Sequence, residues 1–343
     1  PVGQYCRPLA CGRTTEALEA FTAMKTDTTR IDKAALLRRL RDEYELEIEQ
    51  LAFVPKGEES YGYIATTASS QRYFVKVHSF VEGYDEAQLE RLQRPYQIVD
   101  QLVNTYGLHY LVHPLRTSSG EVVTRFDAFT VAVFDYIVGD GLALKTPQPH
   151  DWQQVAKLIA TLHNDTRKLL ASQHSLGLIP EEPFAIGFKS WLLDVLAATE
   201  QAPRTDDAIR QQAWQLLNHE KELVLQYLLR AEELADKAQQ TPYDPALTHG
   251  DLWSGNFLCN TDGEPVLIDP SAAFAHREMD LAMARLFGGF DPAFFAAYER
   301  AWPLEPGFVE RLGIYQLYYL MVHLNLFGEG YLRQVRDILN RFA

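Results

Sequence analysis

The sequence predicts an α+β protein built in two lobes, with a small antiparallel sheet first and a larger, mostly helical part after it. Runs of β-branched and aromatic residues occur up to about residue 137, whereas from Pro147 onward apolar residues recur at helical spacing. The Gly-Asp-Gly triplet at 139–141 is typical of a flexible joint between the two parts. We therefore expect an extension of uncertain order at 1–30, a first lobe at 31–137 and a second lobe at 138–343.

Composition excludes several classes of protein. With 343 residues and 47% apolar residues the chain is globular and has a core of ordinary size. The net charge of −14 argues against nucleic acid as a partner and suits a substrate that carries amines. No apolar run approaches the ~18 residues of a membrane span. Three cysteines form neither a disulfide framework nor a metal cluster, and no signal segment is evident, so we expect a cytoplasmic protein. We expect it to be a monomer or a homodimer.

The first lobe is expected to begin with a helix. Asp32 would cap it, and leucines at helical spacing continue it to Tyr44. Two antiparallel strands at 56–65 and 71–78 should follow, joined across a turn at 66–70. Strands at 110–114 and 129–136 would complete the sheet.

Lys76 stands out on the second of these strands, because one long cation is out of keeping with its aromatic and β-branched neighbours. A strand lysine can point to solvent. It can also bind the phosphates of ATP when it pairs with a glutamate on the next helix. We favour Glu90 over Glu86 as that partner, since Pro95 should interrupt the helix soon afterwards.

A loop over the phosphates could be formed by residues just before this strand, although the chain has no G-x-G-x-x-G pattern there. The candidates are Lys56, Gly57, Ser60 and Gly62. The end of the last strand, Asp135, Tyr136 and Ile137, lies where a two-lobed kinase reads adenine through its backbone, and only their position supports this role.

The second lobe is expected to be helical. A helix at 151–171 has one apolar face and carries His163, which is more often a satisfied core or surface histidine than a ligand. A helix around Trp191 and a longer one at about 207–239 should follow. Four further helices are expected at 280–287, 292–302, 308–326 and 331–342, the first of them closed by Gly288-Gly289.

The most informative stretch is HGDLWSGN at 249–256, followed by a short apolar run and then Asp269. Phosphoryl transfer needs a carboxylate that accepts the proton of the attacking hydroxyl, and an amide oxygen and a second carboxylate that hold Mg²⁺. Asp251 and Asn256 have the five-residue spacing of a protein-kinase catalytic loop, and Asp269 stands where kinases keep their metal-binding aspartate. An Asx-rich turn would explain any one of these residues, but not the whole set.

The tract 247–330 resembles the fructosamine kinase (ketosamine 3-kinase) family, within the aminoglycoside phosphotransferase and choline kinase-like superfamily. The resemblance is carried by HGDLWSGN at 249–256, GEPV at 263–266, Asp269-Pro270, Arg277-Glu278, DLAM at 280–283, LFGGF at 286–290, YQLY at 315–318 and HLNLFG at 323–328. It implies a bilobal protein-kinase-like fold, with ATP and Mg²⁺ as cofactors. It also implies an acceptor that is a small sugar-like molecule carrying an amine.

The front half departs from that family. The expected Gly-Gly phosphate loop is missing, and residues 138–246 lack the segment that normally precedes the catalytic loop. Three tracts look more like a spectinomycin-type aminoglycoside phosphotransferase: KGEES at 56–60, YFVK at 73–76 and HPLR at 113–116. Both kinds of enzyme phosphorylate polyhydroxylated amines.

The resemblance implies a role for each matching residue. Asp251 would be the general base, Asn256 and Asp269 the Mg²⁺ ligands, and Lys76 the contact to the ATP phosphates. His249 and Asp280 would support the catalytic loop.

We thus expect an ATP-dependent kinase that phosphorylates a hydroxyl of an amine-bearing polyol or sugar, resembling a fructosamine. An antibiotic phosphotransferase is the alternative. A nucleotide-binding pseudokinase would explain the poor phosphate loop, but the intact polar residues speak against it. A purely structural helical protein would leave those residues unexplained.

Overall fold

The computed structural model describes seven stretches of the chain and the single positions 215, 219, 222 and 226. The stretches are residues 31–55, 60–79, 86–127, 129–141, 148–172, 246–327 and 331–342. Internal contacts divide the chain into two compact units. The first contains residues up to 93 and 113–137, and the second contains 94–112 and 138–343.

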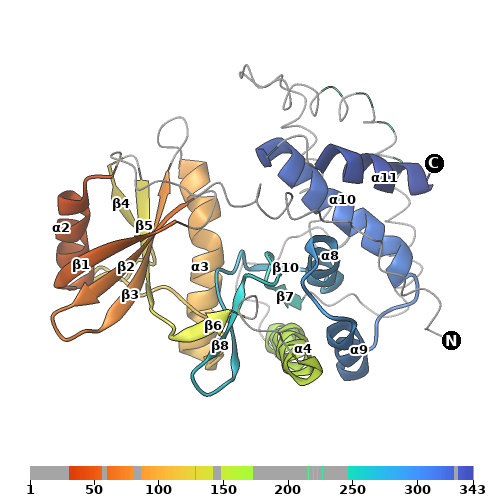
Figure 1. The fold of residues 1–343 in the computed structure, drawn as a ribbon, viewed down its shortest axis with the longest axis horizontal. Helices are drawn as coiled ribbons and strands as arrows, with labels where there is room; N and C mark the ends of the chain where they lie inside the picture. Colours follow the sequence, from red (N-terminus) through yellow and green to blue (C-terminus); the bar gives the residue numbers. More distant parts are fainter. Residues whose placement is uncertain are drawn as a thin grey trace. The chain divides into compact units, whose positions relative to one another are not determined.

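In its described residues the first unit contains a five-stranded antiparallel sheet, helix α2 and the first two turns of helix α3 (Figure 1). The strand order is β1-β2-β3-β5-β4. Helix α2 (Lys33–Tyr44) begins as predicted, because the Asp32 side chain accepts the backbone N–H of Ala34 at 2.9 Å and of Ala35 at 3.1 Å. The strands are β1 (Ile48–Val54), β2 (Ser60–Thr67), β3 (Arg72–Ser79), β4 (Thr124–Phe126) and β5 (Phe129–Asp135).

One face of this sheet packs on α2. Successive strand residues point to opposite faces, so every second residue of β2, β3 and β5 lies in the core. The helix adds Leu36, Leu40 and Tyr44, and the Tyr44 hydroxyl donates to the Val131 carbonyl at 3.1 Å. The sheet residues of this core are Tyr63, Ala65, Tyr73, Val75, Val77, Phe126, Val131 and Val133.

Three expectations about the first part of the chain are wrong. Residues 110–114 form no strand and make only single bridges, Leu111 with Leu267 and Pro114 with Phe134, because Pro114 has no N–H with which to continue a ladder. The sheet is completed instead by β1, whose Glu49-Gln50 hides the alternation, and by β4. Pro95 does not interrupt its helix: α3 runs through it from Glu86 to Tyr106.

The buried face that follows Pro95 gives the reason. Tyr96, Ile98, Val99, Leu102 and Val103 are all at most 4% exposed. Burying such side chains stabilises by about 1.5–3 kcal/mol each, which together exceeds the cost of about 3 kcal/mol for an internal proline. The same face groups residues 94–112 with the second unit.

The second unit is mostly helical, as predicted. Its described residues form the helices α4 (Pro149–Ser172), α8 (Glu278–Phe287), α9 (Pro292–Ala301), α10 (Phe308–Phe327) and α11 (Leu332–Phe342), together with most of α3. Two small antiparallel sheets accompany them. One is β6-β8-β9, with β6 (Gly139–Gly141), β8 (Phe257–Asn260) and β9 (Pro265–Leu267); the other pairs β7 (Ala246–Thr248) with β10 (Ala273–Ala275).

The Gly-Asp-Gly triplet is therefore a strand rather than a flexible joint. Gly139 pairs with Asn260, and a Cβ at Gly139 would come within 2.3 Å of the Cys259 carbonyl oxygen. This glycine permits close approach of two backbones.

Some expectations fall outside the described residues. These are the extension at 1–30, Lys56 and Gly57 of the phosphate loop, the helix around Trp191, and all but four helical positions of the helix at 207–239. Within the described part of the chain, no helix is both long enough and apolar enough to cross a bilayer.

Candidate active site

The HGDLWSGN segment connects β7 to β8, and backbone hydrogen bonds bring Asp269 to it. The Ile268 N–H donates to the Asn256 carbonyl at 3.0 Å, and His249 Nε2 donates to the Ile268 carbonyl at 3.0 Å. The segment therefore closes on the end of β9, directly before Asp269. Asp269 itself is exposed and has a left-handed backbone (φ +55°).

Asp251 and Asn256 are joined directly. Asn256 Nδ2 donates to the Asp251 backbone carbonyl at 2.8 Å and to its carboxylate Oδ2 at 2.6 Å. Asn256 is only 5% exposed, so its side chain is held in one orientation, and Asp251 is half-buried. The two hydrogen bonds fix both the turn between these residues and the direction of the carboxylate.

The donor set fits a magnesium ion that is carried by a nucleotide. Because both hydrogen bonds of Asn256 use Nδ2, its carbonyl Oδ1 is the atom suited to a cation, as is the Asp269 carboxylate. The described residues contain no group of three or more His, Cys, Asp or Glu side chains that could hold a metal ion. Mg²⁺ takes oxygen ligands and is usually held by one or two side chains plus substrate phosphates and water, which two protein ligands would satisfy.

Asp280, at the start of α8, holds the segment from behind. Its carboxylate accepts the backbone N–H of His249 at 2.6 Å and of Gly250 at 2.9 Å, and it is fully buried. Gly250 has φ +79°, and a Cβ there would lie 2.1 Å from the Ser271 carbonyl oxygen. Only glycine meets both conditions. These contacts are what the expected supporting role of His249 and Asp280 requires.

Trp253 lies between the two polar residues with its side chain 41% exposed. Its ring covers Gly255 so closely that a Cβ at Gly255 would come within 2.2 Å of it. The loop thus presents a large aromatic surface to solvent beside Asp251.

In the first unit, Lys76 and Ser60 share one face of the sheet. Lys76 pairs with Gly62 on β2 and with Ala132 on β5, and Ser60 pairs with His78. Directly paired residues point to the same face, so this is the face opposite α2. Lys76 is half-buried, and the Phe74 ring on the same face covers Gly62 so closely that a Cβ there would come within 3.0 Å of it.

The remaining predicted residues are placed as follows. Glu90 is exposed on α3, and its pairing with Lys76 stays a prediction. Asp135 is exposed at the end of β5, and Tyr136 and Ile137 are half-buried after it. The Tyr136 N–H donates to the Arg72 carbonyl at 3.3 Å, and the Arg72 guanidinium lies 4.3 Å from the Tyr136 ring centre. Their contact with adenine also stays a prediction.

His163 is a satisfied core histidine, as expected, but sequence reasoning did not identify its partners. It lies on α4, is fully buried, and bonds both Asp280 and Tyr298. Its position beside Leu162 on an apolar helix face indicated a buried polar ring, which must find partners. The partners are 117 and 135 residues away in sequence, so no local pattern could identify them.

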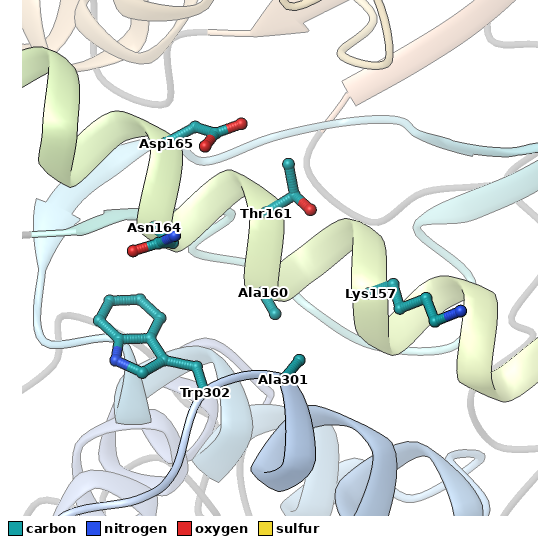
Figure 2. A pocket seen from close by; sticks show the side chains of 7 residues that line it. All are labelled: Lys157, Ala160, Thr161, Asn164, Asp165, Ala301 and Trp302. Atoms are coloured by element: carbon teal, nitrogen blue, oxygen red, sulfur yellow. The ribbon is translucent and has the colours of Figure 1, made fainter.

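A groove of about 370 Å³ lies elsewhere on the second unit, between α4 and the end of α9. Figure 2 shows the Trp302 ring across from the turn of α4 that carries Asn164. The groove is lined by Lys157, Ala160, Thr161, Asn164, Asp165, Ala301 and Trp302. None of the predicted site residues is among them.

Comparison with known proteins identifies similar chains. The family model described as fructosamine kinase matches residues 208–343. A probable ketoamine kinase of Enterococcus faecium is 33% identical over 279 residues, which is 79% of this chain and 87% of the relative. A probable ketoamine kinase of Lactiplantibacillus plantarum is 54% identical over 114 residues, which is 33% of this chain but only 40% of the relative.

Solved structures share the fold. A Thermobifida fusca protein assigned as a fructosamine-3-kinase has a TM-score of 0.57 at 22% identity, covering 89% of this chain and 97% of that one. A spectinomycin phosphotransferase bound to ADP and spectinomycin has a TM-score of 0.56 at 16% identity, covering 92% of each chain. The bilobal kinase-like α+β class is thereby confirmed, and so is the resemblance to the fructosamine kinase family. The likeness to the spectinomycin phosphotransferase shows a shared fold.

Proposed function

The chain belongs to the fructosamine kinase family, and from that premise we propose that it transfers the γ-phosphoryl group of ATP to a hydroxyl of a sugar amine. The observation that carries the proposal is the pair of hydrogen bonds from Asn256 to Asp251. They hold a carboxylate and an amide oxygen in the arrangement that phosphoryl transfer needs. The net charge of −14 also suits an acceptor that carries an amine.

In this proposal Asp251 orients the acceptor hydroxyl and accepts its proton as the oxygen attacks the γ-phosphorus. Asn256 Oδ1 and the Asp269 carboxylate would hold the divalent metal, which we take to be Mg²⁺. When bound, that ion neutralises the charge on the phosphates. Lys76 would contact the phosphates, with Ser60 beside it on the same face of the sheet.

The front half of the chain also supports a ketoamine acceptor over an antibiotic. The match to the Enterococcus relative spans 279 residues, more than the whole of 138–343 contains, so it extends into the first unit. The spectinomycin phosphotransferase, at 16% identity, supports the shared fold alone. We further propose that the protein is cytoplasmic and acts as a monomer or homodimer.

The proposal is tested by the substitution Asp251→Asn, with Asp262→Asn as the matched control because Asp262 is exposed in the turn between β8 and β9. ADP release with Mg²⁺ is measured over fructosamines, aminocyclitols, aminoglycosides and choline. We expect a fructosamine to be phosphorylated. Asp251→Asn should lower kcat by about 10²–10⁴-fold, the usual contribution of a general base, while ATP still binds.

Near-normal turnover by Asp251→Asn would refute the assignment of the base. A preference for aminocyclitols would identify an antibiotic phosphotransferase. Tight ATP binding without turnover of any acceptor would identify a pseudokinase.

A further inference from the structure

His163 connects three helices of the second unit at the back of the catalytic segment. Its Nε2 lies 3.0 Å from Asp280 Oδ2, and its Nδ1 lies 2.8 Å from the Tyr298 hydroxyl oxygen. All three side chains are fully buried. His163 is on α4, Asp280 on α8 and Tyr298 on α9.

The hydrogen bonds of this group have one direction. A carboxylate that receives backbone N–H groups acts as an acceptor, so His163 Nε2 carries the proton and donates to Asp280. In the neutral imidazole His163 Nδ1 then accepts from the Tyr298 hydroxyl, whose oxygen in turn accepts from Arg277 Nη1 at 3.4 Å. Every donor points toward Asp280, and the imidazole is fixed at both nitrogens.

The same carboxylate oxygen serves the catalytic segment. Asp280 Oδ2 accepts from His163 and from the His249 N–H, while Oδ1 accepts from the Gly250 N–H. A rotation of the Asp280 side chain would break both backbone bonds at once. Gly250 is followed directly in the chain by Asp251, so these backbone bonds set the position of Asp251.

We propose that His163 is a positioning residue for phosphoryl transfer, because it locks the Asp280 side chain in the orientation that sets the backbone before Asp251. This inference rests on the proposed role of Asp251 as the base. A displacement of about 1 Å in a reacting group lowers the rate by about 100-fold, so a loosened Asp280 should affect chemistry more than substrate binding.

Three substitutions at His163 separate its two contacts. His163→Gln places an N–H donor near the position of Nε2 and keeps the bond to Asp280. His163→Asn places its polar group near the position of Nδ1, which keeps a contact with Tyr298 and loses the bond to Asp280. His163→Leu loses the bonds to both Asp280 and Tyr298. We expect kcat to fall by about 100-fold in His163→Leu and nearly as far in His163→Asn, with KM for ATP changed much less. His163→Gln should recover most of the lost kcat.

A control must show that the loss is not caused by a weakened fold. Val155→Ala removes buried methyl groups from the same helix, where Val155 is 1% exposed in the hydrophobic core. It should lower the melting temperature and leave kcat close to that of the wild-type protein. If kcat follows the melting temperature across all four variants, the positioning role is refuted.

A second measurement does not depend on turnover. Hydrogen–deuterium exchange of the peptide 246–256 reports the amides of His249 and Gly250. Their exchange should be faster in His163→Leu and His163→Asn than in His163→Gln and Val155→Ala. Unchanged exchange in His163→Leu would overturn the inference. If the wild-type protein phosphorylates no acceptor, the proposed function fails, and the exchange series still decides the role of His163.

Discussion

Two separate features of the structure require glycine at position 250. Its backbone is left-handed with φ +79°, and the Ser271 carbonyl oxygen occupies the space where a side chain would begin. The same turn directs the N–H groups of His249 and Gly250 at the Asp280 carboxylate. The backbone of Gly250, the residue before the proposed base Asp251, is thus constrained by Ser271 as well as by Asp280.

Gly250→Ala should destabilise the protein far more than Gly263→Ala. Gly263 has nearly the same φ, +80°, but a Cβ there would meet nothing within 4 Å. The control therefore measures the left-handed backbone alone, about 1–2 kcal/mol. Gly250→Ala adds a steric clash and should cost at least 2 kcal/mol more, with loss of kinase activity. Urea unfolding of both variants tests this, and equal losses would show that the approach of Ser271 is unimportant.

The structure brings together two of the polar residues that the sequence singled out. Asp251 and Asn256 were identified from their spacing, and their direct hydrogen bond explains that spacing. Gly139 was interpreted as a joint, because sequence does not distinguish a glycine needed for flexibility from one needed for close approach. His163 could not be assigned, because its partners come from distant helices.

Helices α8 and α10 are joined by a buried ion pair. Arg311 donates to both carboxylate oxygens of Glu278, at 2.8 and 2.7 Å, and both side chains are at most 3% exposed. Burial raises the pKa of Glu278, while Arg311 lowers it. Since α8 also begins with the turn that carries Asp280, the pair fixes the helix that supports the catalytic segment.

Arg311→Met should lower the free energy of unfolding by about 3–5 kcal/mol, because it leaves the Glu278 carboxylate buried without its partner. The matched control is Arg285→Met, an exposed arginine on α8, where the guanidinium lies 5.1 Å from the Phe295 ring centre. That change should cost about 1 kcal/mol or less. Adding Glu278→Gln to Arg311→Met should restore part of the loss. An additive double variant would contradict the coupling.

Elements with their own local signals were predicted well. Helix α2 has a capping aspartate, and α8 ends at Gly288, as its sequence indicates. Strands β1 and β4 were missed for physical reasons. β1 has no strict apolar alternation and is stabilised by pairing with β2, and β4 has only three residues. The path of α3 through Pro95 also depends on tertiary packing, since the apolar face after Pro95 is buried.

The stability of the whole molecule should depend on pH through buried histidines. Burial lowers the pKa of His276 well below its usual value, with Arg311 and Arg277 adding to the effect, and burial also lowers the pKa of His323. A lowered histidine pKa favours folding above the unfolded value of about 6.5. As pH falls below that value the unfolded chain takes up protons first, and stability is lost.

We expect the free energy of unfolding to decrease between pH 7 and pH 5, by up to about 1.4 kcal/mol per pH unit for each such histidine. His276→Gln should make this decrease shallower. Glu278 acts in the opposite sense, since its raised pKa removes stability as pH rises through the folded value, and it is present in both proteins compared. Denaturant unfolding at four pH values measures the slopes, and identical slopes would contradict the prediction.

At the scale of the whole chain, order of elements predicted the fold class correctly, whereas the grouping of residues needed three-dimensional contacts. Residues 94–112 come before strands β4 and β5 of the first sheet in sequence. Their apolar face is nevertheless buried with helix α4 in the core of the second unit. The sequence shows how composition changes along the chain. It does not show which of the two cores helix α3 will join.

Trp253 has a practical consequence. Among the described tryptophans, Trp152 is buried and Trp302 half-buried, while Trp253 is the exposed one, and it lies within the segment that contains Asp251 and Asn256. Indole emission shifts with the polarity of its surroundings. The protein therefore carries an intrinsic optical probe inside its proposed active site. Binding of an acceptor next to this ring can be followed by fluorescence without a label and without turnover.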